Sequence, residues 1–459
     1  MAGTCIERRG MLDHAFLGDV LGRLADRHRV PGAQLAVRHR GGTLAVHIGE
    51  TVYGAGGDMT LDTAFPLGSV TKAFTATVAM MLVADGDLGL DEPVREHLPE
   101  LAGPGEQVTV ARLLSHTSGL ASDPDCDSVD CATSLRRYVL DECRPHNLVQ
   151  PPGAGFSYSN LGYALVGLLI ETITGMRWPE ATESILLRPL GVAPAFLDDP
   201  PPSRQVATGH SVNVAIGRTM PVRQSPGVAH APAGGLAASA TDLVSLALLH
   251  VPPGVPNLLP VADAARMRRP VAGAEPFGLA DGWAMGLAAF GSGGSPWFGH
   301  DGNGNGTACY FRVNPSSGDA IAFTSNSNTG YHLWQELLDE LGGRLDVPIG
   351  PHRARVSRRS IPVPASWLGS YVNGDVEYTV TAAAGGHLRL IVDGDVFPGV
   401  TCHDDLTFSL PDPASAQVLH GRFVRDQRTG AVDAIQLSGR TARRRTDDPA
   451  REVRSRLTA

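Results

Sequence analysis

The apolar positions of the N-terminal region predict a helix, a hairpin and a second helix, in that order. Apolar residues first recur at helical intervals ahead of Pro31-Gly32, at Leu12, Phe16, Val20, Leu21 and Leu24. Two runs typical of strands follow at 34–38 and 43–49, and Gly41-Gly42 between them suits a hairpin turn. Helical spacing resumes after residue 69, at Phe74, Val78, Met81 and Leu82, and Asp85-Gly86 ends this second helix.

The middle of the chain alternates between loops and helices. Residues 121–155 are rich in Asp, Pro, Cys and Gly around one short helix near 135–140, which predicts a long loop or lid. Tyr158-Ser159-Asn160 opens another helix, which runs from about residue 161 to 174 and is closed by Gly175. Residues 198–235, which begin with a proline cluster and end at Gly234-Gly235, are interpreted as a second long loop.

The C-terminal half predicts a strand pair, a linker and a separate β unit. Strands at 307–313 and 320–324 are joined by a turn at 314–318, and a helix at 332–341 follows. Short alternating runs broken by Gly, Asp and Pro fill residues 367–440, which fits a small antiparallel barrel. We place the main domain at 1–346, a Pro- and Arg-rich linker at 347–364, the β-barrel at 365–445 and a tail at 446–459.

Composition limits the possible partners and the compartment. The 459 residues are 42% hydrophobic and 19% charged, which is typical of a soluble globular protein with two domains. A formal net charge of −9 argues against a nucleic-acid partner, so the arginines at 353–359 are assigned to the linker and those at 443–445 to a solvated segment. With neither a signal peptide nor an 18-residue apolar stretch, we expect a cytoplasmic protein without a membrane partner.

The six cysteines are too few for a disulfide scaffold. Cys126, Cys131 and Cys143 lie close together, but no neighbouring pair has the C-x-x-C spacing of a zinc site. We therefore expect free thiols and no metal. The segment around Cys126, Cys131 and Asp123–Asp130 could form an acidic lid that selects cationic substrates, although a solvated loop is the simpler interpretation.

The most informative feature is that the chain contains one lysine, Lys72, among 38 Lys and Arg residues. Arginine cannot give up its proton inside a protein, whereas a buried lysine can. Lys72 follows Ser69 by three positions, so the two side chains share one face of a helix. A deprotonated amine beside a serine hydroxyl is the arrangement that activates the serine as a nucleophile.

Two further motifs offer groups for acyl-transfer chemistry. Tyr158 and Asn160 stand at a helix start, and a tyrosine beside an ammonium group can have its pKa lowered and act as a base toward a serine. His300-Asp301-Gly302 enters a strand, where Gly302 would leave room for a substrate backbone. The N-terminus of the helix at Ser69 would stabilise a developing oxyanion.

Together the three motifs resemble the serine β-lactamase and penicillin-binding-protein superfamily, with its S-x-x-K, Y-x-N and K/H-x-G elements. The resemblance covers about residues 11–345 and extends to 113–120, 158–163 and 233–236. It implies a mixed α/β fold with an antiparallel sheet flanked by helices and an all-helical region, here followed by a lipocalin-like β-barrel.

The resemblance also implies a role for each matched residue, with no cofactor. Ser69 would be the nucleophile and Lys72 its hydrogen-bonded partner. Tyr158 would be the base that later protonates the leaving group, and Asn160 would orient the substrate and Lys72. The N–H groups of Ser69 and of Asn303, the residue after Gly302, would form the oxyanion hole.

Histidine at position 300 distinguishes this chain from β-lactamases, which have a lysine there. Histidine is found in the esterase, D-aminopeptidase and acyltransferase branches, and a neutral imidazole holds a carboxylate poorly, so β-lactam hydrolysis is disfavoured. With its C-terminal barrel the chain looks like the stand-alone penicillin-binding-protein-type thioesterases, which cyclise nonribosomal peptides released from a carrier protein.

We therefore predict a serine acyltransferase that takes a peptidyl group from a phosphopantetheinyl carrier protein and releases it by macrocyclisation. The alternative is an esterase or D-aminopeptidase that uses water as acceptor. A catalytically dead binding protein is disfavoured because Ser69, Lys72, Tyr158 and His300 are all present. We expect His116 to have a structural role in a turn, and Trp283 and Trp297 to be packing residues.

Overall fold

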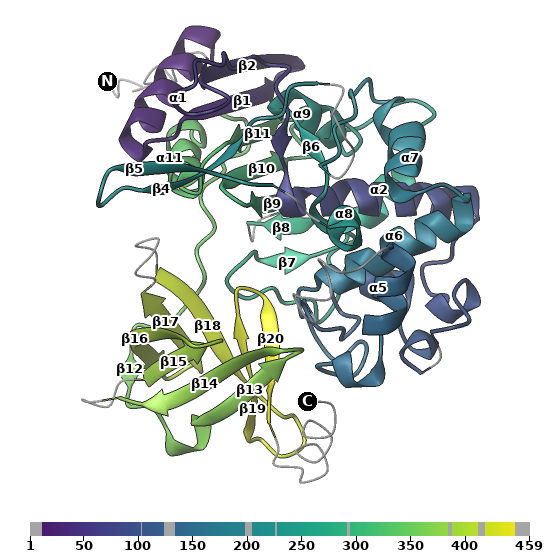
Figure 1. Cartoon of the computed structure of the whole chain (residues 1–459), viewed down its shortest axis with the longest axis vertical. Coiled ribbons are helices and arrows are strands. Elements are labelled where there is room, and N and C mark those ends of the chain that lie inside the picture. Colours follow the sequence, from purple (N-terminus) through teal and green to yellow (C-terminus); the bar gives the residue numbers. More distant parts are fainter. Residues whose placement is uncertain are drawn as a thin grey trace, which may run out of the picture.

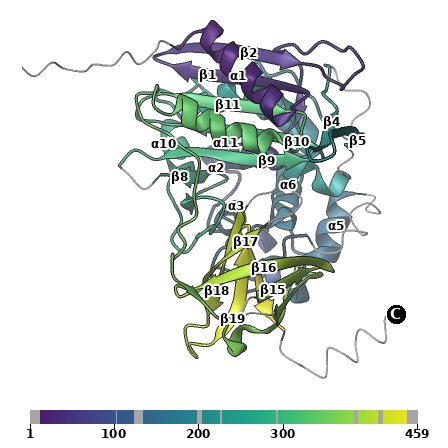
Figure 2. The same ribbon diagram turned by 90° about the vertical axis from the view of Figure 1, so that its left-hand side faces the viewer.

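The computed structural model describes residues 12–101, 103–123, 134–197, 204–224, 227–291, 294–383, 388–411 and 418–445. A mixed α/β region forms the larger part of the molecule, and a β-barrel lies against it in both views (Figures 1 and 2). No helix among the described residues is long and apolar enough to cross a membrane. The segment containing Cys126 and Cys131 lies outside the described residues.

The α/β region is organised around a seven-stranded sheet in which every neighbouring pair is antiparallel. In spatial order the strands are β2 (Gly42–Gly49), β1 (Gly32–His39), β11 (Ala320–Ser325), β10 (Thr307–Val313), β9 (Trp297–Gly304), β8 (Ala288–Phe290) and β7 (Gly282–Trp283). The hairpin predicted around Gly41-Gly42 is confirmed as β1–β2, and the pair predicted at 307–324 as β10–β11.

Helices cover both faces of this sheet, and strand β1 is therefore buried on both sides. Leu35 and Val37 contact the core formed with α1 (His14–His28) and α11 (Gly330–Leu341), whereas Ala36 contacts the core on the opposite face. That opposite core includes α9 (Ala240–Leu248). Alternation of side chains along a strand explains this division.

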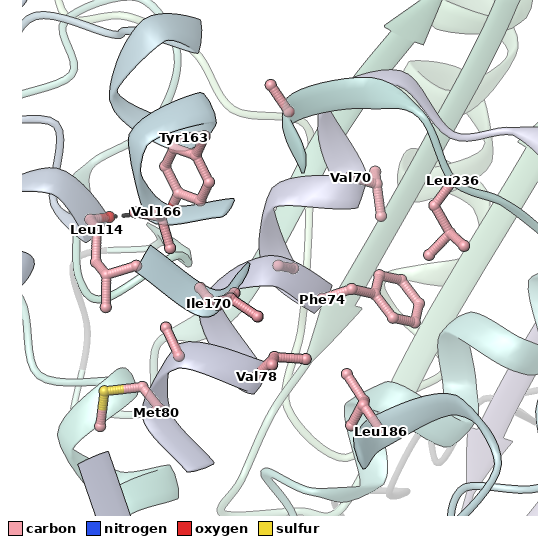
Figure 3. Packing of buried hydrophobic residues seen from close by; sticks show 14 of the residues in the cluster. Val70, Phe74, Val78, Met80, Leu114, Tyr163, Val166, Ile170, Leu186 and Leu236 are labelled. Carbon is pink, nitrogen blue, oxygen red and sulfur yellow. Dashed lines mark hydrogen bonds between the residues drawn. The ribbon is translucent and has the colours of Figure 1, made fainter. Parts of the chain in front are cut away.

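A cluster of helices packs beside the sheet and includes the helix that directly follows the turn of the predicted nucleophile. Its members are α2 (Thr71–Asp85), α3 (Val110–Leu114), α5 (Leu135–Glu142), α6 (Asn160–Thr174), α7 (Trp178–Thr182), α8 (Ala231–Gly234) and α10 (Val261–Met267). Helix α2 is buried continuously from Thr71 to Leu82, as expected of a helix that is apolar on all sides. Figure 3 shows Phe74 and Val78 of α2 in the same core as Val166 and Ile170 of α6.

The interpretation of 198–235 as one long loop is wrong for part of that segment. Strands β4 (Gly209–Asn213) and β5 (Arg218–Val222) form a hairpin there, and Gly217 supplies the turn with a φ of +64°. The backbone N–H of His210 donates to the carbonyls of Gly306 and Asn326, at 2.9 and 3.0 Å, which fixes the hairpin to the main sheet. Strand β6 (Ala237–Ala238) then pairs with β3 (Phe65–Pro66) ahead of the predicted nucleophile.

The predicted small antiparallel barrel is confirmed. Strands β13 to β20 close into an eight-stranded barrel through the β16–β17 pair, and the short β12 (Ser360–Ile361) extends the sheet beside β16. The barrel strands are β13 (Gly369–Asn373), β14 (Val376–Ala382), β15 (Leu388–Val392), β16 (Asp395–His403), β17 (Thr407–Pro411), β18 (Val418–Arg425), β19 (Val432–Leu437) and β20 (Arg440–Arg444). Aromatic side chains including Trp367, Tyr371 and Phe423 fill its core.

The interpretation of 443–445 as a solvated segment is wrong for Arg443 and Arg444, because both belong to β20. The guanidinium of Arg444 donates to Leu368 O at 2.8 Å and to the Tyr371 hydroxyl at 2.6 Å. Arg444 thus joins β20 to the segment of β13, and a sequence run alone does not distinguish that role from a solvated surface.

Candidate active site

Ser69 lies in a single 3-10 turn, Gly68–Val70, that leads directly into α2. This turn packs closely on strand β9. A Cβ atom at Gly302 would lie 2.1 Å from the Leu67 carbonyl oxygen, and one at Gly68, where φ is +51°, would lie 2.5 Å from the Asn303 carbonyl oxygen. The expectation that Gly302 leaves room for substrate is therefore wrong, because the nucleophile turn occupies that space.

Lys72 is fully buried, and its Nζ lies 3.0 Å from Ser69 Oγ and 2.8 Å from the Ala233 carbonyl oxygen. Burial lowers the pKa of Lys72 from 10.5 to about 7, although the Asp123 carboxylate partly opposes the shift. A substantial fraction of the amine is thus neutral near pH 7. A neutral amine keeps a lone pair that can accept the serine proton.

Tyr158 faces the same two side chains from the segment that precedes α6. Its ring centroid lies 5.0 Å from Lys72 Nζ, and its buried hydroxyl has no hydrogen-bond partner within 3.5 Å among the described residues. Burial raises the pKa of Tyr158, which the nearby Ser69 side chain opposes only in part. The predicted lowering of this pKa is wrong because desolvation outweighs the neighbouring charge. The phenol keeps its proton at neutral pH, which favours Lys72 as the base and Tyr158 as a hydrogen-bond donor.

His300 presents an unprotonated ring nitrogen to the site. Its Nδ1 lies 2.7 Å from the Asp301 carbonyl oxygen and must donate to it, so the buried Nε2 carries the lone pair and has no partner among the described residues. Burial, with a smaller effect of Lys72, lowers the pKa of His300 to about 3. His300 is therefore neutral and cannot replace the cation with which a β-lactamase holds a carboxylate.

The structure does not pair Asn160 with Lys72. Asn160 Nδ2 donates to Asp123 Oδ1 at 2.7 Å, and Asp123 Oδ2 lies 3.9 Å from the Arg440 guanidinium. Asn160 thus belongs to a polar cluster at the edge of the site.

Asn303 lines the same cavity as Ser69, and its side-chain oxygen accepts from the Tyr310 hydroxyl at 3.2 Å.

A cavity of about 220 Å³ opens above Ser69. Its polar lining comes from Ser69, Tyr158, His300 and Asn303, and its apolar wall comes from Leu279, Trp283, Ala288 and Phe290. Trp283, expected to serve only packing, is both buried and part of this wall. Trp297 donates to the Pro348 carbonyl oxygen at 3.3 Å and packs in the core, as expected.

The barrel completes the site through the β19–β20 hairpin, which sequence reasoning did not anticipate. Ser438 and Arg440 line the cavity, and the Arg440 guanidinium lies 5.5 Å from the centroid of the Tyr158 ring. The Gly439 carbonyl oxygen accepts the Tyr158 N–H at 3.0 Å. In the sequence Arg440 belongs to no motif, so nothing there indicates that it lies near Tyr158.

One group could be considered for a metal ion among the described residues, namely His39, Asp319 and Asp346. His39 Nδ1 lies 2.8 Å from Asp319 Oδ1, and Asp319 Oδ2 accepts from the Ser317 hydroxyl at 2.9 Å. Both hydrogen bonds pair His39 and Asp319 with protein groups. None of the three residues lines the cavity at Ser69.

His116 packs against the Tyr158 ring and hydrogen-bonds to the adjacent backbone. Its backbone is left-handed, with φ of +56°, and its Nδ1 accepts the Ser159 N–H at 3.1 Å. The imidazole stacks on the Tyr158 ring with centroids 4.2 Å apart and planes at 28°. The expected structural role of His116 in a turn therefore also includes holding the ring of Tyr158 in place.

Replacing His116 by asparagine should separate this support from folding. Asparagine adopts the left-handed conformation readily, and its side-chain oxygen can accept the Ser159 N–H. Loss of the stacked ring should lower kcat about tenfold with little change in KM. A tenfold loss corresponds to about 1.4 kcal/mol in the activation barrier, which is similar to the free energy of one favourable ring contact. Steady-state kinetics would measure this effect, with the partly buried His97, which does not line the cavity, changed to asparagine as a control. An unchanged kcat in His116→Asn would contradict the role.

The pKa of Lys72 predicts the acidic limb of the pH profile. Lys72 must be neutral to accept the Ser69 proton, so kcat/KM should rise with pH through about 7 and then level off. The rate is lost below this value because protonation removes the lone pair. Rates measured between about pH 5 and pH 9 would test the expectation, and a flat profile across that range would contradict it.

A family model described as Beta-lactamase matches residues 17–340. Penicillin-binding protein 4 of Amycolatopsis lactamdurans is 35% identical over 345 residues, which are 72% of this chain and 90% of that protein. Esterase EstB of Burkholderia gladioli is 32% identical over 270 residues, which are 50% of this chain and 68% of the esterase. The range matched by the family model includes the motifs at Ser69, Tyr158 and His300.

Solved structures extend the likeness to the barrel. The crystal structure of SurE is 39% identical with a TM-score of 0.83, and covers 94% of this chain and 99% of SurE. A second SurE structure contains D-Leu and has a TM-score of 0.82. A D-stereospecific amidohydrolase from Streptomyces sp. is 25% identical with a TM-score of 0.56, over 71% of this chain and 98% of the amidohydrolase.

Proposed function

Because this chain belongs to the β-lactamase family, which includes penicillin-binding-protein-like serine enzymes, we propose that it is a peptide-cyclising thioesterase. It takes a peptidyl group from a carrier-protein thioester onto Ser69. It then releases the group by attack of an amine of the same peptide, which closes a macrocycle in nonribosomal peptide biosynthesis.

Acylation follows from the protonation states in the site. Neutral Lys72 takes the proton of Ser69 as Oγ attacks the thioester carbonyl, and the N–H groups of Ser69 and Asn303 stabilise the oxyanion. The Lys72 ammonium then passes this proton to the departing thiolate, to which Tyr158, still protonated, donates a hydrogen bond. The thiol leaves and an ester to Ser69 remains.

Deacylation reverses these proton movements. The substrate amine attacks the ester carbonyl, neutral Lys72 takes its proton, and the resulting ammonium gives a proton to Ser69 Oγ as the ester bond breaks. His300 Nε2, a buried acceptor, can hold an N–H of the incoming amine, which a lysine at that position would repel. The apolar wall at Trp283 and Phe290 limits competition by water.

The observation that carries the proposal is the position of the barrel. Stand-alone penicillin-binding-protein-type thioesterases resemble this chain in having a lipocalin-like domain, and here the barrel supplies Ser438 and Arg440 to the cavity wall. The likeness to SurE covers 94% of the chain, and one SurE structure holds D-Leu, which supports a D-residue at the acylating end of the peptide.

A second candidate is an esterase or D-aminopeptidase that uses water as acceptor with the same residues. The 32% identity to esterase EstB and the likeness to a D-stereospecific amidohydrolase favour it. Such an enzyme would turn over simple nitrophenyl esters or D-amino-acid amides rapidly. If large peptidyl thioesters reacted and the simple esters and amides did not, the esterase or D-aminopeptidase function would be excluded.

Mass spectrometry of the products distinguishes the two candidates. The substrate would be a peptidyl pantetheine thioester that ends in a D-residue, with Ser69→Ala as the control. Release of the thiol with a product one water lighter than the free acid would support cyclisation. Formation of the linear acid alone, across a set of such peptides, would refute it in favour of hydrolysis.

A further inference from the structure

The hairpin formed by β4 and β5 exposes large apolar side chains to solvent. Val214, Ile216 and Met220 are 52%, 69% and 44% exposed. Single apolar residues are common on protein surfaces, but three of them on one short hairpin form a patch, and such patches mark interaction sites. In Figure 1 the hairpin extends outward from the main sheet.

The strand register places part of this patch on one face of the hairpin. Met220 lies opposite Ser211, and Arg218 lies opposite Asn213, and all four residues are exposed. Side chains that are directly opposite in an antiparallel pair share a face, so Arg218 and Met220 are neighbours on the solvent side. The turn then adds two apolar residues at the end of the hairpin. We call the set of Val214, Ile216, Arg218 and Met220 the hairpin surface.

The charge of the hairpin is opposite in sign to that of the whole chain. Residues 209–224 include two arginines and no acidic residue, whereas the formal net charge of the chain is −9. A Cβ atom at Gly217 would lie 2.9 Å from Arg29 Nη1, so another guanidinium lies beside the turn. A partner that fits this surface must therefore offer apolar side chains next to carboxylates.

The base of the hairpin lies close to the catalytic cavity. The His210 N–H donates to the Gly306 carbonyl oxygen at 2.9 Å, and Asn303, on the strand that leads to Gly306, lines the cavity together with Ser69. The five residues of β4 span about 17 Å. A phosphopantetheine arm has about 15 bonds between its serine and its sulfur, equivalent to about five extended residues, so it also spans about 17 Å. A carrier protein on the hairpin would thus have its thioester within reach of Ser69.

We infer that the hairpin surface is the docking site of the carrier protein, which offers apolar residues and carboxylates beside the serine that bears its arm. This inference rests on the proposed function and adds the surface by which the carrier-bound substrate is recognised. The hairpin contributes to binding of the carrier and takes no part in the chemistry at Ser69.

The test compares one peptidyl group on pantetheine with the same group on a phosphopantetheinylated carrier protein. In the Ile216→Ser, Arg218→Glu double variant, kcat/KM for the carrier-bound substrate should fall at least about tenfold, as expected when an apolar contact and a neighbouring charge are lost from an interface. The rate on pantetheine should stay unchanged, because neither residue lines the cavity. Changing the carboxylates beside the carrier's serine to arginine should restore part of the rate with the double variant.

The matched control is Val396→Ser with Arg389→Glu, an exposed apolar residue and an exposed arginine of the barrel. This pair should leave both rates unchanged. An equal loss on both substrates in the hairpin variant, no loss on either, or a similar loss in the barrel pair would overturn the inference.

Sedimentation of the protein without carrier tests the other occupant of this surface. A dimer that the hairpin substitutions dissociate would assign the surface to a second copy of the chain and would also overturn the inference. If the unaltered protein released no thiol from either thioester, the proposed function itself would be refuted.

Discussion

Replacing Lys72 by arginine is expected to lower kcat/KM by about 10³-fold, nearly as much as replacing it by alanine. Both changes remove the lone pair that accepts the Ser69 proton. Arginine retains a positive charge near Ser69 Oγ, where Nζ now lies at 3.0 Å, but it cannot be deprotonated. The single lysine of the chain is thus explained by its titration and not by its charge. Single-turnover thiol release would measure the acylation step in each variant.

Lys72→Met provides the control for folding. Moving a lysine pKa from 10.5 to about 7 means that burial of the amine costs the native state several kcal/mol below neutral pH. Methionine has a similar length and no such cost, so this variant should melt at a higher temperature while remaining inactive. Retention of more than about a tenth of the activity by a folded Lys72→Arg variant, a loss under about 1.4 kcal/mol in the barrier, would contradict the role of Lys72 as base.

Sequence alone predicts those parts of the site that depend on local spacing. Ser69 and Lys72 are one helical turn apart, so the helix brings them together wherever it packs, and the structure places them 3.0 Å apart. The hairpin at β1–β2 and the strand pair β10–β11 follow from alternation and turn residues in the same way. The sequence motifs identified Tyr158 and His300 as candidate site residues, and the packing of the fold places both in the lining of the cavity at Ser69.

Other parts could not be predicted because they depend on burial and on distant contacts. The pKa of Tyr158 is raised by desolvation, which a neighbouring residue in the sequence does not reveal. Gly302 accommodates the Leu67 carbonyl, and this close approach exists only once strand β9 meets the nucleophile turn. Arg440 reaches the cavity only because the barrel docks with its β19–β20 hairpin toward Tyr158.

Replacing Asn373 by alanine should show that this docking matters for catalysis. Asn373 is buried on β13, where its Oδ1 accepts the Ser122 N–H at 2.8 Å and its Nδ2 donates to Ser157 Oγ at 3.3 Å and Thr441 O at 2.9 Å. The contact with Ser122 joins residues 251 positions apart. Alanine would leave a buried N–H without a partner, at a cost of about 1–3 kcal/mol in unfolding free energy.

The larger effect of Asn373→Ala should be on the rate, because Ser157 directly precedes Tyr158 and Ser122 hydroxyl donates to the Tyr158 carbonyl oxygen at 2.6 Å. A displacement of about 1 Å in a reacting group can cost up to about 10²-fold, so we expect kcat to fall by about 10- to 100-fold. Tyr371→Phe is the matched control: it lies on the same strand and loses the hydrogen bonds of its hydroxyl to Trp367 O at 2.7 Å and from Arg444 at 2.6 Å, within the barrel. It should lower the melting temperature to a similar extent while kcat stays unchanged. Equal kcat values for Asn373→Ala and Tyr371→Phe would mean that the barrel covers the site without positioning Tyr158.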